Sequence, residues 1–292
     1  MRVPFRRILV VVKHTPYEQY VQLKAQGKAP LALRWERLKN RFMIHRECVN
    51  SLQAILERHN VKCLVVGREE LDRQHIQDVD LVVAVGGDGT VLSSSHFLDD
   101  SVPLVGINSD PTRESERDAK KKADERRSFG ALCYCTAENM EIMLPRVLLK
   151  AVEPKKRARI QTIVRSTFTE TKLPPALNDI LVAHPSPAAV SSRFRLGFLD
   201  GAGLEEIEHF SFNVWSSGIW ICTATGSTAA MQAAGGEVMP PSSQELQYMV
   251  REHLLEEGTE THLRRQGHGI VKAGSKMRIR WNSQVRCGAA CI

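Results

Sequence analysis

Residues 86–90 of this 292-residue chain, with the sequence GGDGT, combine features that phosphate chemistry needs. The glycines follow the apolar run 79–85 and precede a helical pattern at 91–98, so backbone amides and a helix dipole could hold an anion. A carboxylate beside bound phosphates is unfavourable because both groups are negative, so its presence indicates a chemical role. Asp88 can hold Mg²⁺ or accept a proton from a hydroxyl nucleophile. The alternative is a tight turn in which Asp88 caps the following helix.

A second cluster, residues 223–228, carries hydroxyl groups on both sides of Gly226. It follows the apolar run 219–223 and precedes the helix-forming stretch 229–234. Hydroxyls that donate and accept suit ribose, phosphate or an edge of adenine. Helix capping by Ser227 or Thr228 would explain one hydroxyl but not the whole set, so ligand binding is the favoured interpretation.

A third cluster, Asn178-Asp179, directly precedes the apolar run 180–184. The Asn178 amide can bond a base or a ribose through both its donor and its acceptor, and Asp179 can accept from a sugar hydroxyl. Turn chemistry before a strand is the alternative for such a pair.

The surrounding pattern predicts two domains that carry these clusters. Up to about residue 155, apolar runs at 8–12, 61–66 and 79–85 alternate with helical stretches, the longest of them at 35–59. Continuous apolar strands imply burial on both faces, and the alternation predicts a parallel, Rossmann-like α/β domain over residues 1–155. Short segments with period-two alternation then predict a mainly antiparallel β domain over 156–292.

Composition narrows the class of partner. The chain has a net charge of +7 and 42% hydrophobic residues, and it contains no apolar run of the ~18 residues needed to cross a bilayer. Aromatic residues make up only 6%, and Lys and Arg are dispersed, which argues against nucleic acid and favours small phosphorylated molecules. The charged run 113–127 is expected to be a solvated helix or loop.

The scattered cysteines match no zinc-binding spacing, and we expect no metal held by the chain itself. They are expected to be buried, idle thiols in a reducing compartment, which for this chain we take to be the cytoplasm. No peroxisomal signal of the Ser-Lys-Leu type stands at residue 292.

Taken in this order, the three clusters resemble the NAD kinase family, and residues 109–111 and 219–231 resemble its plant NADH kinase branch most. The resemblance implies transfer of the γ-phosphoryl group of ATP, bound with Mg²⁺, to the 2′-hydroxyl of the adenosine ribose of NAD(H). It implies that Asp88 acts on that hydroxyl as general base or orienting acceptor. It also implies a phosphate-binding loop of Gly86, Gly87, Gly89 and Thr90, and binding of the dinucleotide by Asn178, Asp179, Thr223, Thr225, Gly226, Ser227 and Thr228.

The chain departs from the family pattern in two places. Ala224 and Ala230 stand where many members have Pro and Tyr, which is one reason to favour the reduced cofactor NADH. Residues 284–292 show no strand alternation and no Asp-Gly turn, which predicts a truncated β domain with an unpaired sheet edge and reduced stability. The resemblance also implies a homodimer. Two alternatives stay open: a lipid or sugar kinase with a GGDG loop, and a nucleotide-binding module without catalysis.

Overall fold

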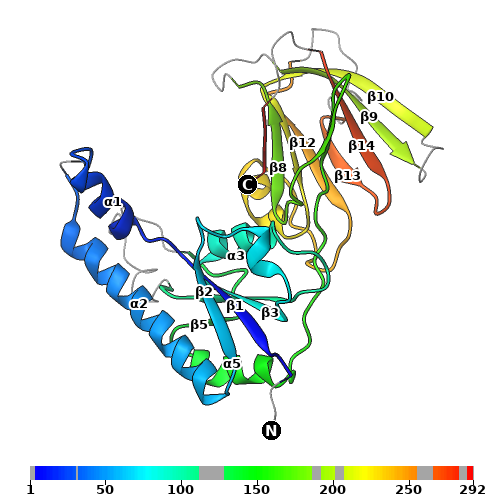
Figure 1. Ribbon diagram of the computed structural model, residues 1–292. Helices are drawn as coiled ribbons and strands as arrows, with labels where there is room; N and C mark the ends of the chain where they lie inside the picture. Colours follow the sequence, from blue (N-terminus) through cyan, green and yellow to red (C-terminus); the bar gives the residue numbers. More distant parts are fainter. Residues whose placement is uncertain are drawn as a thin grey trace. The chain divides into compact units, whose positions relative to one another are not determined.

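The computed structural model describes residues 4–30, 32–111, 128–185, 192–200, 207–254, 266–282 and, as backbone alone, 288–291 (Figure 1). The chain separates into two compact units, Met1–Lys155 and Lys156–Ile292, which we call unit 1 and unit 2. The charged run 113–127 lies outside the described residues. Within them, no helix is long and apolar enough to cross a lipid bilayer.

Unit 1 contains a parallel five-stranded sheet in the order β2-β1-β3-β4-β5. Alternate residues of the central strands feed two apolar cores, one on each face, because successive side chains of a strand point in opposite directions. This arrangement confirms the predicted α/β class. The strands are β1 (Arg7–Val12), β2 (Lys62–Gly67), β3 (Leu81–Gly86), β4 (Leu104–Asn108) and β5 (Cys135–Thr136).

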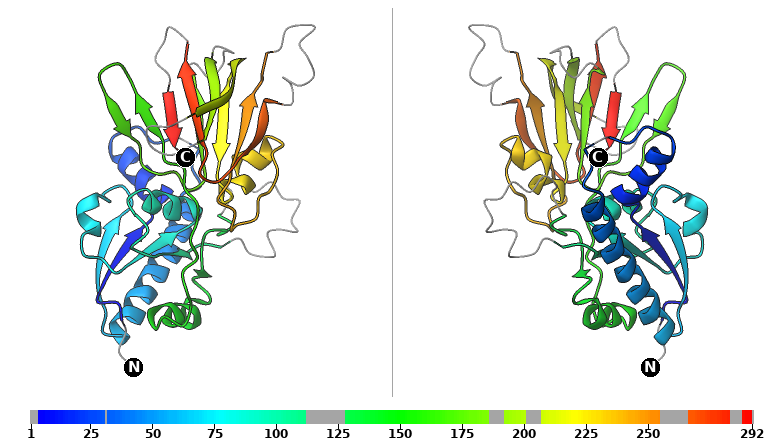
Figure 2. Two further views of the ribbon diagram at one scale, coloured as in Figure 1. Left: turned by 90° about the vertical axis from the view of Figure 1, so that its right-hand side faces the viewer. Right: turned by 90° about the vertical axis from the view of Figure 1, so that its left-hand side faces the viewer.

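The long helix α2 lies along one face of the sheet (Figures 1 and 2), where it shares an apolar core with the strands and with α5. The helix α1 contributes no buried residue. The predicted helix at 35–59 is confirmed, whereas the stretch 69–77, whose pattern also predicts a helix, contains only a single 3₁₀ turn. The helix α1 begins with a capping box, in which Thr15 and Glu18 satisfy each other's backbone amides. The helices are α1 (Pro16–Ala25), α2 (Trp35–Arg58), η1 (Arg73–Ile76), α3 (Asp88–Ser95) and α5 (Met140–Leu148).

The strand β2 corrects one expectation. Its apolar run predicts burial on both faces, yet Leu64 is 51% exposed and Val65 is 38% exposed. The reason is position, because β2 is the edge strand of the sheet and pairs only with β1 among the described residues. By contrast, every residue of the central strand β3 is buried.

Unit 2 is built from antiparallel strands, which confirms the predicted class for this half. A three-stranded sheet has the order β10-β9-β14 and a five-stranded sheet the order β13-β12-β11-β8-β15, with a separate hairpin β6-β7. The two larger sheets share one core, in which Phe194, Phe212 and Val214 meet Ile221 and Tyr248. The strands are β6 (Ile163–Arg165), β7 (Glu170–Lys172), β8 (Asp179–Ala183), β9 (Ser192–Asp200), β10 (Ile207–Ser216), β11 (Gly218–Cys222), β12 (Leu246–Arg251), β13 (His268–Val271), β14 (Lys276–Trp281) and β15 (Gly288–Cys291), and the helices are η2 (Gly226–Thr228) and α6 (Ala230–Ala233).

The end of the chain corrects one part of a second expectation, the unpaired sheet edge, whereas the truncation of the β domain and its reduced stability stay predictions. Residues 288–291 form the strand β15, although their sequence has no strand alternation. The strand pairs antiparallel with β8, from Gly288 opposite Ala183 to Cys291 opposite Ile180. The expected unpaired edge is therefore covered along β8, because backbone hydrogen bonding does not depend on side-chain pattern.

The cysteines whose side chains are described, Cys48, Cys63, Cys133, Cys135 and Cys222, are free thiols, as expected. Burial raises the pKa of Cys48 and Cys133 to about 12 and that of Cys135 and Cys222 to about 11. The pKa of Cys63 is raised for the same reason. Cys48, Cys63 and Cys135 pack as small apolar side chains in one core of unit 1.

Removing residues 284–292 should destabilise unit 2, because the edge of β8 loses its partner strand. We expect a loss of about 1–2 kcal/mol and a melting temperature several degrees lower, measured by calorimetry. Removal of Ile292 alone is the control and should leave the melting temperature unchanged. Equal melting temperatures for the full chain and the longer deletion would show that β15 contributes no stability.

Candidate functional site

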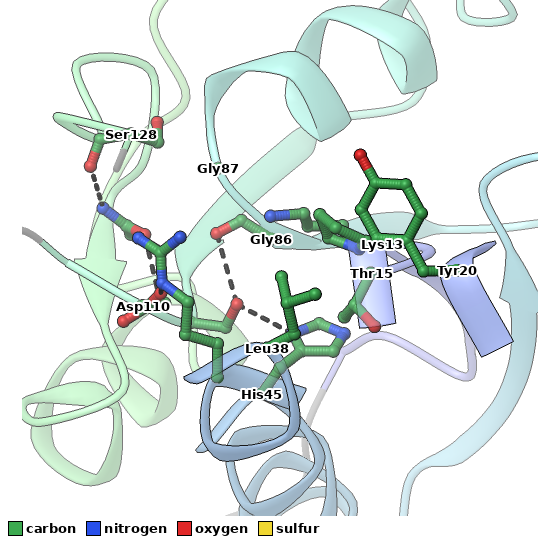
Figure 3. Close-up of a pocket in the computed structure, with 13 residues that line it drawn as sticks. Lys13, Thr15, Tyr20, Leu38, His45, Gly86, Gly87, Asp110 and Ser128 are labelled. Atoms are coloured by element: carbon green, nitrogen blue, oxygen red, sulfur yellow. Dashed lines mark hydrogen bonds and ion pairs between the residues drawn. The ribbon is translucent and has the colours of Figure 1, made fainter. Parts of the chain in front are cut away.

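A pocket of about 330 Å³ lies in unit 1, where β1, β3 and β4 end (Figure 3). From β1 the sheet grows to one side with β2 and to the other with β3, β4 and β5, and the pocket lies at this reversal. Open α/β sheets bind ligands at this place, beyond the carboxyl ends of the strands. The pocket is lined by Lys13, Thr15, Pro16, Tyr20, Leu38, Arg41, His45, Gly86, Gly87, Asn108, Ser109, Asp110 and Ser128.

The GGDGT loop forms one wall of this pocket through its first two residues. Gly86 ends β3 and Gly87 caps α3, so the tight-turn alternative with Asp88 as the cap does not hold. A Cβ on Gly86 would collide with the hydroxyl of the buried Thr90, and one on Gly87 would lie 2.5 Å from the Cβ of Ser128. These glycines are therefore required by close packing. A Cβ on Gly89 would meet nothing within 4 Å.

The Asp88 carboxylate fastens the loop to residues 128–132. Its Oδ2 accepts from the Ser128 hydroxyl at 3.0 Å and from the amides of Gly130 and Ala131, each at 3.2 Å. Its Oδ1 accepts from the amide of Leu132 at 2.8 Å. Oδ1 thus accepts one hydrogen bond while Oδ2 accepts three, so Oδ1 is the oxygen with room for a further donor. These contacts hold the carboxylate beside Ser128, which lines the pocket.

Charged groups from three elements converge on the pocket. The Arg41 Nε of α2 lies 3.3 Å from an oxygen of Asp110, and both side chains are largely buried. Lys13 follows the last residue of β1. His45 is buried, with its Nδ1 2.8 Å from the Ser109 hydroxyl, and burial, reinforced by the Lys13 charge, lowers its pKa to about 4.

Sequence reasoning missed these residues, although part of the signal was present. Lys13 and Asp110 each follow an apolar run of the parallel sheet, and the carboxyl ends of parallel strands meet at one edge. Arg41 and His45 gave no such signal, because a helical pattern indicates which face is buried but not which element covers it.

In unit 2 the structure brings the second and third clusters together. The amide of Thr223 donates to the carbonyl of Asn178 at 2.9 Å, and the Thr223 hydroxyl donates to that of Leu177 at 2.5 Å. A Cβ on Gly226 would collide with the Asn178 carbonyl, so only glycine allows this approach. The Thr223 hydroxyl also accepts from the amides of Thr225 and Gly226 and thereby shapes the loop.

Of the other three hydroxyls of the second cluster, two form hydrogen bonds within the loop region and one forms none. The Ser227 hydroxyl donates to the Ala224 carbonyl at 2.8 Å and accepts from the Met239 amide at 2.9 Å. The Thr228 hydroxyl donates to the Thr225 carbonyl at 3.3 Å. The half-buried Thr225 hydroxyl has no hydrogen bond within the described part of the chain, and it is the one best placed to contact a ligand.

Asp179, the first residue of β8, is only 2% exposed, and its Oδ1 has no hydrogen-bond partner among the described residues. Burial raises the pKa of this carboxyl to about 6. Buried polar atoms are nearly always hydrogen-bonded, so Oδ1 marks a position where a ligand donor would be accepted.

A parallel sheet with a glycine loop at a helix N-terminus defines a nucleotide-binding α/β protein, here continued by an antiparallel β unit. Residues 36–110 match the family model of the ATP-NAD kinase N-terminal domain. The chain is 42% identical over 248 residues to a probable NADH kinase of rice (Oryza sativa subsp. japonica), covering 85% of this chain and 73% of that protein. It is also 42% identical over 284 residues to an NADH kinase of Arabidopsis thaliana, covering 95% and 84%.

Among solved structures, yeast NADH kinase complexed with NADH shares this fold. The TM-score is 0.59 at 15% sequence identity, over 98% of this chain and 75% of that one. The chain belongs to the NAD kinase family. The resemblance drawn from the three clusters and the predicted fold class are both confirmed.

Replacing Asp179 with Asn should stabilise the folded chain at neutral pH. Its folded pKa of about 6 lies above the ordinary 3.8, so its ionisation lowers stability as pH rises from about 4 to 6, and the full penalty applies above that range. The difference corresponds to about 3 kcal/mol at pH 7, measured as the free energy of unfolding in urea. Parent and variant should converge near pH 4.

Asp80→Asn is the matched control with the opposite sign. Asp80 accepts from the amides of Arg7 and Arg6, and these hydrogen bonds lower its pKa. Its contribution to stability is present at neutral pH and is lost as pH falls, so this variant should be less stable at pH 7. A gap between parent and Asp179→Asn that stays constant from pH 4 to 7 would contradict the role of ionisation.

Proposed function

We propose that this chain transfers the γ-phosphoryl group of ATP to the 2′-hydroxyl of the adenosine ribose of NADH and NAD, giving NADPH and NADP. The observation that carries the proposal is the Asp88 carboxylate, held by backbone amides and Ser128 with room for a further donor on Oδ1. The rice and Arabidopsis relatives, named as NADH kinases, support the reduced cofactor as substrate.

The phosphates of ATP bind on the side of unit 1. Gly86 and Gly87 line the pocket on this side, and the positive charges of Lys13 and Arg41 lie in the same pocket. The N-terminus of α3, with Gly89 and Thr90 in its first turn, adds the favourable end of a helix dipole.

Mg²⁺ would accompany ATP as its counterion. Within the described residues, no three His, Cys, Asp or Glu side chains gather into a metal site. Such a chain fits Mg²⁺ that is carried chiefly by phosphate oxygens and water, with one carboxylate such as Asp110 nearby. When bound, the ion offsets the charge that builds up on the phosphates.

The adenosine part of the dinucleotide binds to unit 2. The unpartnered Asp179 oxygen accepts from a ribose hydroxyl, and the Asn178 amide and Thr225 hydroxyl contribute further hydrogen bonds. The close approach at Gly226 and the buried hydroxyls of Thr223 and Ser227 keep this loop in shape.

Phosphoryl transfer requires positioning more than covalent help. The Asp88 Oδ1 accepts the hydrogen of the 2′-hydroxyl and aligns its oxygen with the γ-phosphorus. A bond forms between that oxygen and the phosphorus as the bond to the β-phosphate oxygen breaks, and ADP leaves. The hydroxyl proton passes to Asp88 and then to water.

The finer expectations are part of the same proposal and rest on the family resemblance. They are a homodimer, a cytoplasmic location, and partners restricted to nucleotides, with neither nucleic acid nor membrane. Light scattering of the purified chain tests the first, and localisation of a tagged chain in cells tests the second.

Purified chain incubated with Mg-ATP and NADH, NAD or diacylglycerol tests the function as a whole. We expect NADPH as the product from NADH and NADP as the product from NAD, each identified by chromatography. Lipid phosphate would support a lipid kinase instead, and nucleotide binding without any product would support a non-catalytic module.

Asp88→Asn should lower kcat by about 100-fold or more while the Kd for ATP changes little, because the base is lost and the phosphate-binding groups remain. Ser128→Ala is the control for loop anchoring, since it keeps the carboxylate and its amide contacts, and its loss should stay below about tenfold. If Asp88→Asn turns over at a rate near the parent's, a group other than Asp88 must accept the proton of the 2′-hydroxyl.

Gly89→Ala and Gly86→Ala should distinguish an effect on ATP binding from an effect on the stability of the fold. The first adds a methyl group into open space, so the melting temperature should hold while kcat/KM for ATP falls about tenfold or more. The second collides with Thr90 and should lower the melting temperature in addition. A fully active Gly89→Ala chain would mean that no nucleotide approaches this residue.

A further inference from the structure

The three-stranded sheet of unit 2 has an outer face that is rich in positive charge. Its strands β10, β9 and β14 lie side by side (Figure 1), and one face of the sheet packs on the core shared with the five-stranded sheet. Successive side chains of a strand point to opposite faces, so the chain neighbours of the core residues Phe194 and Leu196 lie on the other face. We call this the outer basic face, and its charged side chains among the described residues are Arg193, Arg195, Glu208, Lys276, Arg278 and Arg280.

Glu208 and Ser211 join three arginines of this face into one network. A register shift directly after Glu208 brings its carboxylate to this face, 3.6 Å from Arg278 and 3.5 Å from Arg280. The Nε and Nη2 of Arg195 donate to the Ser211 hydroxyl at 3.1 and 2.7 Å. A hydrogen bond from Ser211, together with the charges of the three arginines, lowers the pKa of Glu208. One carboxylate thus serves three guanidinium groups, and positive charge is in excess among these side chains.

Two of the arginines stand directly opposite each other in neighbouring strands. Arg195 of β9 pairs with Arg280 of β14, and both side chains are exposed. Directly opposed residues have Cβ atoms about 5 Å apart, and like charges in this position destabilise a sheet. Glu208 offsets the charge of Arg280 only in part, because it also faces Arg278. A negatively charged ligand would relieve the repulsion, so this face is suited to bind anionic groups.

The geometry of the arginines favours the carboxylates of an extended peptide. Of the five N–H groups of the Arg195 guanidinium, Ser211 receives two, which fixes the direction of the others, and a guanidinium so oriented can bind a carboxylate through paired N–H groups. Arg193 and Arg195 are two positions apart on β9, which corresponds to ~6.8 Å along the strand. Every second side chain of an extended peptide repeats at the same spacing.

Other polyanions fit this face less well. Single-stranded nucleic acid binds through rings on which its bases stack, and an anionic membrane binds through apolar side chains that insert into it. Among the described residues of the outer basic face, Trp215 is the one exposed aromatic or large apolar side chain. The Arg193 guanidinium already covers its ring, 4.2 Å from the centroid.

We propose that the outer basic face of unit 2 docks an extended acidic segment of another protein, whose alternate carboxylates pair with Arg193, Arg195 and Arg280. The candidate site residues Asp179 and Thr225 belong to β8 and to the loop after β11, in the opposite sheet, so a docked segment leaves them accessible. The family resemblance implies nucleotides alone as partners. The inference therefore rests on the geometry of unit 2 and is independent of the proposed function.

The test measures binding of a fluorescent peptide of alternating Glu and Ser, about twelve residues long, whose carboxylates repeat every ~6.8 Å. Fluorescence anisotropy with the full chain at about 50 mM salt gives the Kd. The double variant Arg195→Ala, Arg280→Ala should weaken binding by about tenfold or more, because two receiving groups are lost. The matched control is Arg58→Ala, Arg165→Ala, which removes two exposed arginines that pair with Glu141 and Glu170 outside this face. It lowers the net charge equally and should change the Kd by about twofold or less.

A second variant gives an effect of the opposite sign and decides the question if the double variant fails to fold. Glu208→Gln keeps an acceptor for the Ser211 hydroxyl and removes the carboxylate that competes for the arginines. The same peptide should bind this variant about threefold more tightly than the parent. An unchanged or weaker affinity of Glu208→Gln would overturn the proposal.

Three further results would overturn it. The first is no binding of the acidic peptide to the parent, and the second is equal weakening in the two double variants, which would show a response to net charge alone. The third is tighter binding of oligouridylate RNA or of phosphatidylserine vesicles with the same dependence on Arg195 and Arg280, since the face would then serve nucleic acid or a membrane. Peptide binding needs no nucleotide, so a chain that forms no NADPH but binds the peptide as expected would refute the proposed function and keep this inference.

Discussion

The hydrogen bonds of the Asp88 carboxylate are the interaction on which the organisation of unit 1 depends. They join the turn between β3 and α3 to residues 128–132, which lie 40 to 44 positions further along the chain. A carboxylate fixed by backbone amides cannot swing freely, so the same contacts that close the loop also fix the direction of its remaining acceptor. Structural and chemical roles therefore coincide in one side chain.

In unit 2, too, a few close contacts hold the loops of the candidate site in place. The contact between Gly226 and the Asn178 carbonyl joins two loops, and the hydroxyls of Thr223 and Ser227 satisfy buried backbone groups there. Amid this satisfied network the Asp179 Oδ1 stands without a partner. An acidic group left in this state lowers the stability of the free protein, a common feature of sites that await a ligand.

The order of elements was predictable because hydrophobic periodicity reports burial directly, as for β1, β3 and α2. It failed where topology decides burial, since Leu64 and Val65 are apolar yet occupy an edge strand. It also failed at Gly288–Cys291, where strand pairing is a backbone property. Among the residues that line the pocket, Gly86 and Gly87 were predictable from local spacing, whereas Arg41 and His45 reach it through packing between elements, which no local pattern contains.

The buried thiols have a consequence for the chain under oxidative stress. Peroxide and disulfide reagents attack the thiolate, and at neutral pH a thiol whose pKa is about 11 or 12 is ionised to a fraction of only ~10⁻⁴ or less. Cys48, Cys133, Cys135 and Cys222 should thus stay reduced when peroxide accumulates. An enzyme that phosphorylates NADH to NADPH would then not lose activity through oxidation of these four thiols at the moment when oxidants draw most heavily on its product.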